Sequence, residues 1–291
     1  MRTEDICAII VTHNPDQEIE EQLNRIANQV GKIVIVDNAS NSERKSKLPL
    51  ICTTLSIVLI DNKQNKGIAT ALNQGIVWAQ EHRFRWVITF DQDTLIEKNL
   101  ISRLAHCYIE IEKTEKIAMI GALYKESYHT SAIDSQASKE ISETKTIITS
   151  GSLFSTDLFN DIGMLREKLF IDCVDHEFCL RCRKLGYKVF VLNEYLMAHS
   201  IGNIVMHQFV GKQIVTTNHS ALRRYYMMRN AIIIFKEYFS FDPHWVTYNL
   251  FLNFKYIFII LLFESHKLQK LKYITIGIVD GIFSNYRKYI L

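Results

Sequence analysis

The stretch "VITFDQDTLI" (residues 87–96) runs from an apolar segment directly into two aspartates that are one residue apart. Its first four residues are typical of a strand buried on both faces of a sheet. Asp91 and Asp93 follow where that strand ends, and two unpaired carboxylates so close together repel each other and raise each other's pKa. A Mn²⁺ or Mg²⁺ ion removes this repulsion and keeps coordination positions open for substrate phosphates. The alternative is an ordinary solvated turn, because Asp-x-Asp is also a common turn composition.

Further apolar runs flank this stretch, and segments of helical length separate them. The predicted strands are 6–12, 32–37, 55–61, 85–91 and 117–123. The predicted helices between them are 16–30, 40–50, 67–83 and 96–114. Because strand and helix alternate, we expect an α/β fold with a Rossmann-like, mostly parallel sheet flanked by helices. Ligands of such sheets bind beyond the carboxyl ends of the strands.

The alternation ends after residue 123, where a polar stretch begins. The pattern then predicts a strand over 146–155, a helix over 173–186 and a strand over 187–193, followed by an aperiodic, mobile segment over 199–220. Residues 221–291 read as helical throughout. We therefore expect a catalytic domain over 1–220, with a nucleotide-binding part at 1–123 and an acceptor part at 124–220, followed by a helical region over 221–291.

Composition and charge agree with an ordered protein of two unlike parts. The chain is 48% hydrophobic with only 3 Pro, which favours a globular protein with a sizeable core. Residues 1–200 hold 23 Lys+Arg and 27 Asp+Glu, whereas residues 201–291 hold 11 and 4, so the net charges are −4 and +7. Because the basic surplus lies in an apolar tail and not in a basic, aromatic groove, we do not expect nucleic-acid binding.

The cysteines and the N-terminus suggest a reducing compartment. The first residues have no charged-then-apolar leader, so we expect the cytoplasm. Cys173, His176, Cys179 and Cys182 recur every three residues and are candidate zinc ligands. Side chains spaced by three along one helix rise along one face and cannot surround an ion tetrahedrally. Packed, reduced cysteines are therefore the expected alternative.

The other predicted strands also end on small polar residues: "THN" after the first, "DNAS" after the second and "DNKQNKG" after the third. The Asp37 carboxylate can accept paired hydrogen bonds from the imide N–H of a base or from a ribose hydroxyl. The alternative is that "DN" only forms an ordinary turn, in which these residues are common. A glycine that opens a helix, such as Gly67, lets backbone N–H groups approach a phosphate. Neither GxGxxG nor GxxxxGK[ST] follows a predicted strand, which disfavours dinucleotide and P-loop sites.

A second acidic cluster lies in "LFIDCVDHEF", where Asp172, Asp175 and Glu177 open the predicted helix. Acidic residues in a first turn are favoured by the helix dipole alone. A carboxylate that follows apolar residues and has an acidic neighbour is also one that can be tuned into a general base.

Taken in this order, the motifs resemble those of the inverting GT-A glycosyltransferases of family 2, and most closely the bacterial rhamnosyltransferases of that family. The matching pieces are "IIVTHNPD", "IVIVDNAS", "NKGIATALNQGI", "WVITFDQDT", "SGSLFS", "IGMLREKLFIDCVDHEFCLRCRKLGYKV", "HSIG" and "RRYYMMRN". They extend from residue 6 to about residue 235.

The resemblance implies a role for each matching residue. Those implied to bind the nucleotide or its sugar are Thr12, His13, Asn14, Asp37, Asn38, Asn65, Gly67, Asn73, Asp91 and Gln92, with Asp37 on the base. Those implied to hold a Mn²⁺ or Mg²⁺ cofactor are Asp91, Asp93 and His199, although a buried, satisfied histidine is the alternative for His199. Those implied on the sugar and acceptor side are Gly151 and Ser152.

The resemblance also implies a reaction. Asp175 falls at the position of the general base, with Asp172 and Glu177 as supporting acidic residues, and Arg229 stabilises the leaving diphosphate. The expected donor is dTDP-β-L-rhamnose, and the expected acceptor is a lipid-linked oligosaccharide of bacterial surface polysaccharide, such as lipopolysaccharide O-antigen. The alternatives are a UDP- or GDP-sugar donor, a sugar nucleotidyltransferase, or a non-catalytic, membrane-bound glycan-binding protein.

The tail has the composition of a membrane-associating appendage. Residues 246–263 are nearly long enough to span a bilayer but contain Asn249, Asn253 and Lys255. An apolar and basic segment follows, which suits a helix lying on an anionic membrane surface. We therefore expect a protein peripheral on the inner face of the cytoplasmic membrane. The alternative is a helical hairpin packed on the catalytic domain or on a second subunit, as in a homo-oligomer.

Overall fold

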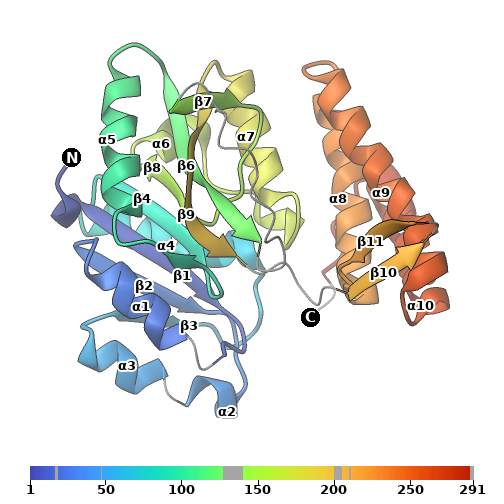
Figure 1. Cartoon of the computed structure of the whole chain (residues 1–291), viewed down its shortest axis with the longest axis horizontal. Coiled ribbons are helices and arrows are strands. Elements are labelled where there is room, and N and C mark those ends of the chain that lie inside the picture. Colours follow the sequence, from blue (N-terminus) through green and yellow to red (C-terminus); the bar gives the residue numbers. More distant parts are fainter. Residues whose placement is uncertain (17–18, 47, 127–139, 200–204, 210, 289–291) are drawn as a thin grey trace. The chain divides into compact units, whose positions relative to one another are not determined.

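The computed structural model describes residues 1–16, 19–46, 48–126, 140–199, 205–209 and 211–288 (Figure 1). The chain divides into two compact units. The first, which we call the sheet unit, comprises Met1–Glu167 and Phe178–Ser200. The second, the helical unit, comprises Lys168–Glu177 and Ile201–Leu291. The division falls within one helix, α7 (Val174–Lys184). The expected domain boundary at residue 220 stays a prediction.

The sheet unit contains one mixed sheet. Its strands are β1 (Ile6–Thr12), β2 (Lys32–Asp37), β3 (Val58–Asp61), β4 (Trp86–Asp91), β5 (Leu95–Ile96), β6 (Ile117–Glu126), β7 (Ile141–Thr144), β8 (Ser152–Ser155) and β9 (Lys188–His199). They run in the order β3-β2-β1-β4-β8-β6-β9-β5, and β7 pairs with β9. Strands β1 to β4 are mutually parallel, as predicted, whereas β8 is antiparallel to both of its neighbours. The sheet is thus parallel where the predicted nucleotide residues lie and mixed beyond.

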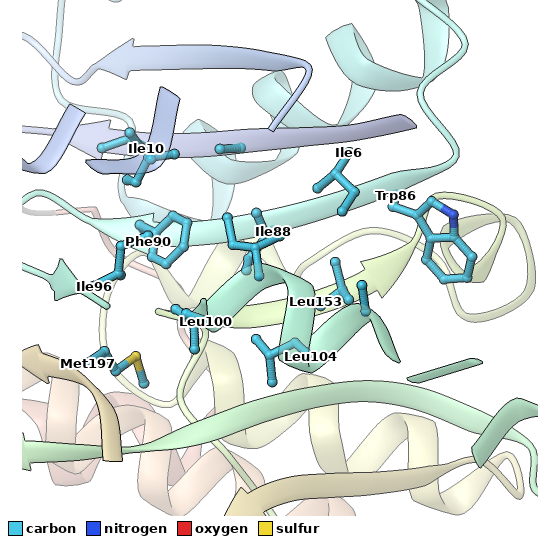
Figure 2. Close-up of a cluster of buried hydrophobic side chains, with 14 of the residues drawn as sticks. Ile6, Ile10, Trp86, Ile88, Phe90, Ile96, Leu100, Leu104, Leu153 and Met197 are labelled. Atoms are coloured by element: carbon cyan, nitrogen blue, oxygen red, sulfur yellow. The ribbon is translucent and has the colours of Figure 1, made fainter. Parts of the chain in front are cut away.

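Helices cover both faces of this sheet, because its strands are apolar on both sides. The helices are α1 (Ile19–Ala27), α2 (Ser42–Lys45), α3 (Leu48–Thr54), α4 (Ile68–Glu81), α5 (Leu100–Glu112) and α6 (Leu158–Ile162), with a 3₁₀ turn, η1, at Thr3–Asp5. Alternate residues of β1, such as Ile6 and Ile10, join a buried core with α1, α3 and α5 (Figure 2). The residues between them face α4 on the other side, where a β-carbon on Gly75 would lie 2.4 Å from Ile9 Cγ2.

Several predicted elements differ in extent from those observed. The predicted helix over 40–50 is two short helices, α2 and α3, and β8 occupies only the last four residues of the strand predicted over 146–155. Strand β7 lies inside the polar stretch after residue 123, where no strand was predicted, and it pairs with β9. Its four residues, "ISET", have too little hydrophobic alternation to predict a strand without a partner.

The helical unit contains three long helices and a hairpin. Its elements are η2 (Glu167–Leu169, begun in the sheet unit), β10 (Val205–Phe209), β11 (Lys212–Thr216), α8 (Ala221–Tyr238), α9 (Pro243–Phe263) and α10 (Lys267–Ile282). The antiparallel pair β10 and β11 lies where an aperiodic segment was predicted. The helical prediction for 221–291 is correct over three helices and ends at Ile282. Asp242 caps α9 through a hydrogen bond from the backbone N–H of Trp245, and Pro243 occupies the first turn.

A buried ionic group joins the three long helices. Glu264, just after α9, accepts hydrogen bonds from Arg224 of α8 at 2.6 Å and from Lys270 of α10 at 2.8 Å. All three side chains are almost completely buried. Breaking such a buried group by removing one partner leaves an uncompensated charge, which typically costs about 3–5 kcal/mol. Lys270 is therefore a structural cation and not part of a basic membrane-facing surface.

Helix α9 is apolar on its outer side. It is 21 residues long, has a mean hydropathy of 1.7 over its best 18-residue window, and only 11% of that window is buried. By length and composition it is the one described helix that is able to cross a membrane. The core helices of soluble proteins can have the same length and composition, so this property alone is weak evidence for a membrane span.

We expect Gly75→Ala to destabilise the sheet unit. Alanine has a higher helix propensity than glycine by about 1 kcal/mol, but overpacking a core typically costs about 1–3 kcal/mol. A contact of 2.4 Å with Ile9 places this substitution at the upper end of that cost, so a net loss of about 1–2 kcal/mol is expected. Chemical denaturation measures it. Val77→Ala, at an exposed position of the same helix, is the control and changes the stability by about 0.5 kcal/mol or less.

Candidate functional site

The carboxyl ends of β1, β2 and β4 bring the predicted nucleotide residues together. Thr12 is paired with Asp37 across β1 and β2, and Val11 is paired with Asp91 across β1 and β4. Since these strands are parallel, their polar terminal residues lie at the same edge of the sheet. We call this group of side chains the strand-end site.

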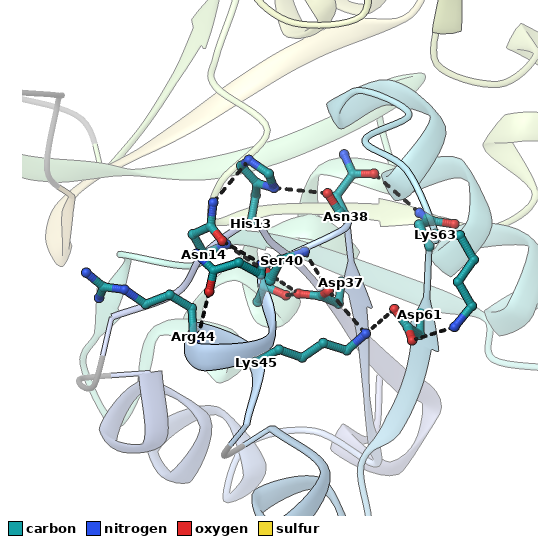
Figure 3. Close-up of polar contacts among 12 residues, drawn as sticks. His13, Asn14, Asp37, Asn38, Ser40, Arg44, Lys45, Asp61 and Lys63 are labelled. Atoms are coloured by element: carbon teal, nitrogen blue, oxygen red, sulfur yellow. Dashed lines mark hydrogen bonds and ion pairs between the residues drawn. The ribbon is translucent and has the colours of Figure 1, made fainter. Parts of the chain in front are cut away.

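Asp37 is the buried anchor of the strand-end site (Figure 3). Its Oδ1 accepts hydrogen bonds from the hydroxyls of Thr12 at 2.9 Å and Ser40 at 2.5 Å. Its Oδ2 accepts a third from the backbone N–H of Ser40 at 3.0 Å, and Lys45 Nζ lies 3.8 Å away. Three of the roughly four lone-pair positions of the carboxylate are therefore used inside the protein. Lys45 also pairs with Asp61, and this pair holds the pKa of the Asp61 carboxyl below its usual range.

His13 and Asn14 join the loops after β1, β2 and β4. The backbone N–H of His13 donates to Gln92 Oε1 at 2.8 Å, and Gln92 Nε2 donates back to the His13 carbonyl at 3.3 Å. The backbone N–H of Asn14 donates to the Ser40 hydroxyl at 2.7 Å. Asn14 adopts a left-handed backbone with φ of 52°, which asparagine tolerates better than most residues. Gln92 therefore ties the Asp91 turn to the end of β1.

Asn38 extends the same network toward helix α4. Its Nδ2 donates to Asn65 Oδ1 at 2.9 Å, and its Oδ1 accepts from the backbone N–H of Lys66 at 2.9 Å. Asn65 Oδ1 also accepts from the N–H of Gly67, which precedes α4 with φ of 87°. Two predicted residues, Asn38 and Asn65, thus fix the backbone that opens α4.

Asp91 and Asp93 lie where β4 ends, and Asp91 is partly buried whereas Asp93 is exposed. The backbone N–H of Asp91 donates to the Ser150 hydroxyl at 3.1 Å, which holds the turn against the segment before β8. Among the described residues, no group of three or more His, Cys, Asp or Glu side chains is arranged to hold a metal ion. Two adjacent carboxylates nevertheless fit Mn²⁺ or Mg²⁺, because these ions are commonly bound by one or two carboxylates together with substrate phosphates.

Three other predicted residues of the sheet unit make internal contacts. Asn73 is buried and exchanges hydrogen bonds with the backbone of Leu165 at 2.9 and 3.0 Å. The Ser152 hydroxyl donates to the Ile148 carbonyl at 2.6 Å. Gly151 has φ of 75°, and a β-carbon there would lie 2.4 Å from Met197 Sδ, so only glycine fits. The predicted contacts of these residues with the sugar and acceptor stay predictions.

The second acidic cluster lies on a strained loop of the helical unit. Phe170, Asp172 and Cys173 all have positive φ, between 61° and 69°. Such conformations cost about 1–3 kcal/mol each and persist where surrounding contacts impose them. One of these contacts is a forked pair, in which Arg223 donates from Nε and Nη2 to the Asp172 carboxylate at 3.1–3.2 Å. Arg223 therefore engages Asp172 but not Asp175.

Helix α8 also holds the backbone of this loop. Arg229 Nη2 donates to the carbonyls of Lys168 and Leu169 at 3.1 and 2.9 Å. Asn230 Nδ2 lies 2.8–3.0 Å from the carbonyls of Leu169, Ile171 and Asp172. We call these contacts the α8 clamp. The Arg229 side chain is fully buried, so the expected contact with a diphosphate requires this clamp to open.

Asp175 is the least constrained carboxylate of the cluster. Its Oδ1 accepts from the backbone N–H of His176 at 2.8 Å, whereas its Oδ2 accepts no hydrogen bond from the residues that the structure describes. Asp175 also lines a cavity of about 210 Å³, and residues of α8 and α9 form the rest of its lining. Glu177 is buried instead and accepts a hydrogen bond from the Tyr238 hydroxyl at 2.9 Å. Of the three acidic residues, Asp175 is best suited to accept a proton from a ligand.

The cysteines of α7 belong to the protein interior. Cys179 and Cys182 are fully buried, and the predicted helix is confirmed as α7. Burial raises the pKa of the Cys173 thiol well above its ordinary value, and the Asp172 and Asp175 carboxylates raise it further. Cys173 therefore stays a protonated thiol, which is a poor nucleophile and a poor metal ligand.

His199 ends β9, but its side chain lies outside the described residues, so the predicted metal contact stays a prediction. Four residues that were not predicted from the sequence contact either the strand-end site or the second acidic cluster. These are Ser40, Ser150, Arg223 and Tyr238. The first three belong to the matching pieces "IVIVDNAS", "SGSLFS" and "RRYYMMRN", in which other residues were the predicted site residues. Tyr238 had no sequence signal, because its partner is 61 residues away.

Comparisons with known proteins agree with this arrangement. The family model Glycosyl transferase family 2 matches residues 7–174, more than half of the chain. The dTDP-rhamnosyl transferase RfbF of Shigella flexneri is 33% identical over 246 residues, which cover 80% of this chain and 80% of that protein.

Solved structures show the same fold. One is the mannosyltransferase PcManGT from Pyrobaculum calidifontis in complex with GDP-Man and Mn²⁺. The match covers 98% of this chain and 88% of the PcManGT chain, with a TM-score of 0.62 and 14% sequence identity. Another is S. aureus TarS 1-349 in complex with UDP-GlcNAc. The match covers 98% of this chain and 73% of the TarS 1-349 chain, with a TM-score of 0.54 and 16% sequence identity. This chain spans 44% of the longer TarS chain.

The family match, the relative of 33% identity and the strand-end site lead to one conclusion. The chain is an enzyme with the GT-A fold that belongs to glycosyltransferase family 2.

Proposed function

We propose that the protein is a metal-dependent, inverting glycosyltransferase that moves L-rhamnose from dTDP-β-L-rhamnose to a hydroxyl of a lipid-linked glycan. The choice of dTDP-rhamnose as the donor rests on the 33% identity, over 80% of both chains, to a dTDP-rhamnosyl transferase. The product would be an α-L-rhamnoside of a bacterial surface polysaccharide.

The strand-end site supports nucleotide binding. Asp37 orients the hydroxyls of Thr12 and Ser40, and Asn38 with Asn65 positions the backbone N–H groups that precede α4. Polar groups held by a rigid sheet are preorganised, so a ligand spends little free energy on ordering them. In this proposal His13, Asn14 and Gln92 complete the edge of the nucleotide site.

Asp91 and Asp93 would hold Mn²⁺ or Mg²⁺, with His199 as a further candidate ligand. Asp93 is the exposed one of the two carboxylates and thus the better candidate for direct contact. A bound divalent cation supplies positive charge next to the diphosphate, where negative charge develops as the bond to the sugar breaks.

Asp175 would act as the general base. The acceptor oxygen forms a bond to the anomeric carbon while its proton passes to Asp175 Oδ2. The bond between that carbon and the diphosphate oxygen breaks, and its electron pair leaves with dTDP. Because the attack comes from the side opposite the leaving group, one displacement inverts the anomeric centre. The engagement of Asp172 by Arg223 supports the assignment of this role to Asp175.

A different donor is the second candidate. Two proteins of the same fold were solved with GDP-Man and with UDP-GlcNAc, so the fold itself accommodates more than one nucleotide. A competing donor would use the same base and the same metal-binding carboxylates.

The helical unit would attach the enzyme to the inner face of the cytoplasmic membrane. Several apolar side chains of α9 are exposed, among them Phe251 at 62% and Phe258 at 69%. A helix with such a face suits the interface between headgroups and acyl chains, where a lipid-linked acceptor is found. Association of two copies through these helices is the alternative use of the same face.

We expect dTDP with Mn²⁺ to stabilise the protein more than UDP or GDP with Mn²⁺. A ligand at 100 times its Kd contributes about 2.7 kcal/mol, which raises the Tm by several degrees in a protein of this size. A thermal-shift panel with and without Mn²⁺ measures the effect. Asp93→Asn should abolish the dependence on Mn²⁺, while Asp157→Asn, at an exposed position away from the site, should keep it. A larger shift with UDP or GDP would contradict the choice of dTDP.

Asp175→Asn should lower kcat by about 10²–10⁴ while the Kd for dTDP changes by less than about twofold, because the amide cannot accept the proton. Single-turnover transfer assays and calorimetry measure the two quantities. Asp172→Asn is the matched comparison, and it should cost less because Arg223 engages that carboxylate. Full activity of Asp175→Asn would remove Asp175 from the role of base.

Replacing Phe251 and Phe258 together by Ser should weaken binding to vesicles that contain anionic lipid by at least about tenfold. The reason is that burial of each phenyl ring contributes about 1.5–3 kcal/mol. Co-sedimentation measures the bound fraction. Leu50→Ser is the control, since Leu50 is an apolar residue of the sheet unit that is 72% exposed. Undiminished sedimentation of the double variant would contradict membrane binding through α9.

A further inference from the structure

The cavity beside Asp175 has walls of two kinds. One wall carries the acidic start of α7, and the others come from α8 and α9. Met227 and Ile234 of α8 are apolar, whereas α9 contributes Trp245, Asn249 and Asn253. The volume of about 210 Å³ is below the range of about 300–1,000 Å³ that is typical of sites for drug-sized ligands. The cavity therefore suits a ligand as small as one sugar ring.

The residues from α9 form a row along one side of the helix. Trp245, Asn249 and Asn253 are spaced by four, so they lie above one another on one face. Two asparagines are unusual in a helix whose best window has a mean hydropathy of 1.7. Each donates from Nδ2 to a carbonyl one turn earlier, to that of Trp245 at 2.9 Å and to that of Asn249 at 3.0 Å. Their Oδ1 atoms accept no hydrogen bond from the part of the chain that the structure describes.

The Trp245 ring is held at the side of the cavity. Its neighbour is His176 of α7, whose ring centroid lies 5.1 Å away in an edge-to-face arrangement with an interplanar angle of 84°. Edge-to-face packing restrains an aromatic ring without covering its whole surface. The ring is only partly buried, so part of it is available to a ligand.

We propose that this cavity is the binding site for the acceptor monosaccharide. The proposal rests on the proposed function, because Asp175 is the base that the acceptor hydroxyl must reach. The C–H face of the sugar packs on Trp245, and its hydroxyls donate to Asn249 Oδ1 and Asn253 Oδ1. One further hydroxyl lies within hydrogen-bond distance of Asp175 Oδ2, which is the geometry that a general base requires. Met227 and Ile234 select a sugar with an apolar substituent, such as a deoxy or N-acetyl methyl group.

Fluorescence titration tests binding without the transfer reaction. The probes are octyl glycosides of a 6-deoxyhexose, an N-acetylhexosamine and an unmodified hexose. We expect a saturable change in tryptophan emission with the first or second probe, absent in Trp245→Phe. Asn249→Leu, which keeps the branched shape of the side chain but removes its polar atoms, should raise the Kd at least tenfold, whereas Tyr248→Ala, at an exposed position of the same helix, should not. No saturable change with any probe, or an equal Kd in Asn249→Leu, would overturn the proposal.

A transfer assay separates this proposal from the proposed function. Asn249→Leu should raise the acceptor KM at least tenfold while acceptor-independent hydrolysis of the donor stays within twofold of the wild-type rate. Transfer with an unchanged acceptor KM in both Asn249→Leu and Trp245→Ala would overturn the acceptor site but leave the enzymatic assignment intact. Saturable probe binding without transfer from any nucleotide-sugar would overturn the proposed function and leave the sugar site intact.

Discussion

The α8 clamp is the contact on which the candidate base depends. The loop before α7 contains three residues with positive φ, and backbone of this kind relaxes unless other groups impose it. Arg229 and Asn230 impose it by donating to successive carbonyls between residues 168 and 172. Losing the clamp would remove hydrogen bonds to four carbonyls of this loop, and each typical hydrogen bond contributes about 0.5–1.5 kcal/mol.

The strand-end site is also held by a buried polar side chain, but there the side chain is an anion that accepts hydrogen bonds instead of a cation that donates them. There a buried carboxylate, Asp37, accepts three hydrogen bonds, one from Thr12 at the end of β1 and two from Ser40 in the loop after β2. In both places a buried side chain with several hydrogen bonds holds a loop backbone in one conformation. At the acidic cluster the carboxylate proposed to meet the acceptor is Asp175, whose one described hydrogen bond comes from the backbone N–H of His176. At the strand-end site the carboxylate proposed to meet the metal ion is Asp93, which is exposed.

Helix α9 takes part both in the proposed membrane binding and in the proposed acceptor site. One side of the helix carries the Trp245 row that lines the cavity, and exposed apolar residues lie on other sides. A helix that was only a membrane anchor would have no use for Asn249 and Asn253, and a helix that was only a sugar site would gain nothing from exposed phenylalanines. An acceptor that is a sugar attached to a lipid accounts for both.

The alternation of strands and helices, the parallel β1–β4 region and the strand ends were predictable from the sequence, because they depend on local periodicity and on residues adjacent in the chain. It also predicted α7 and the acidic cluster at its start. Only the tertiary structure decided that Arg223 engages Asp172, that Arg229 holds backbone carbonyls, that Lys270 is buried, and that β7 and the β10–β11 hairpin form. Each of these depends on a partner brought close by folding. Arg223 meets Asp172 51 residues away, Arg229 meets the Leu169 carbonyl 60 residues away, and Lys270 meets the Asn218 side chain 52 residues away. The weakly patterned strands gain their hydrogen bonds from a neighbouring strand.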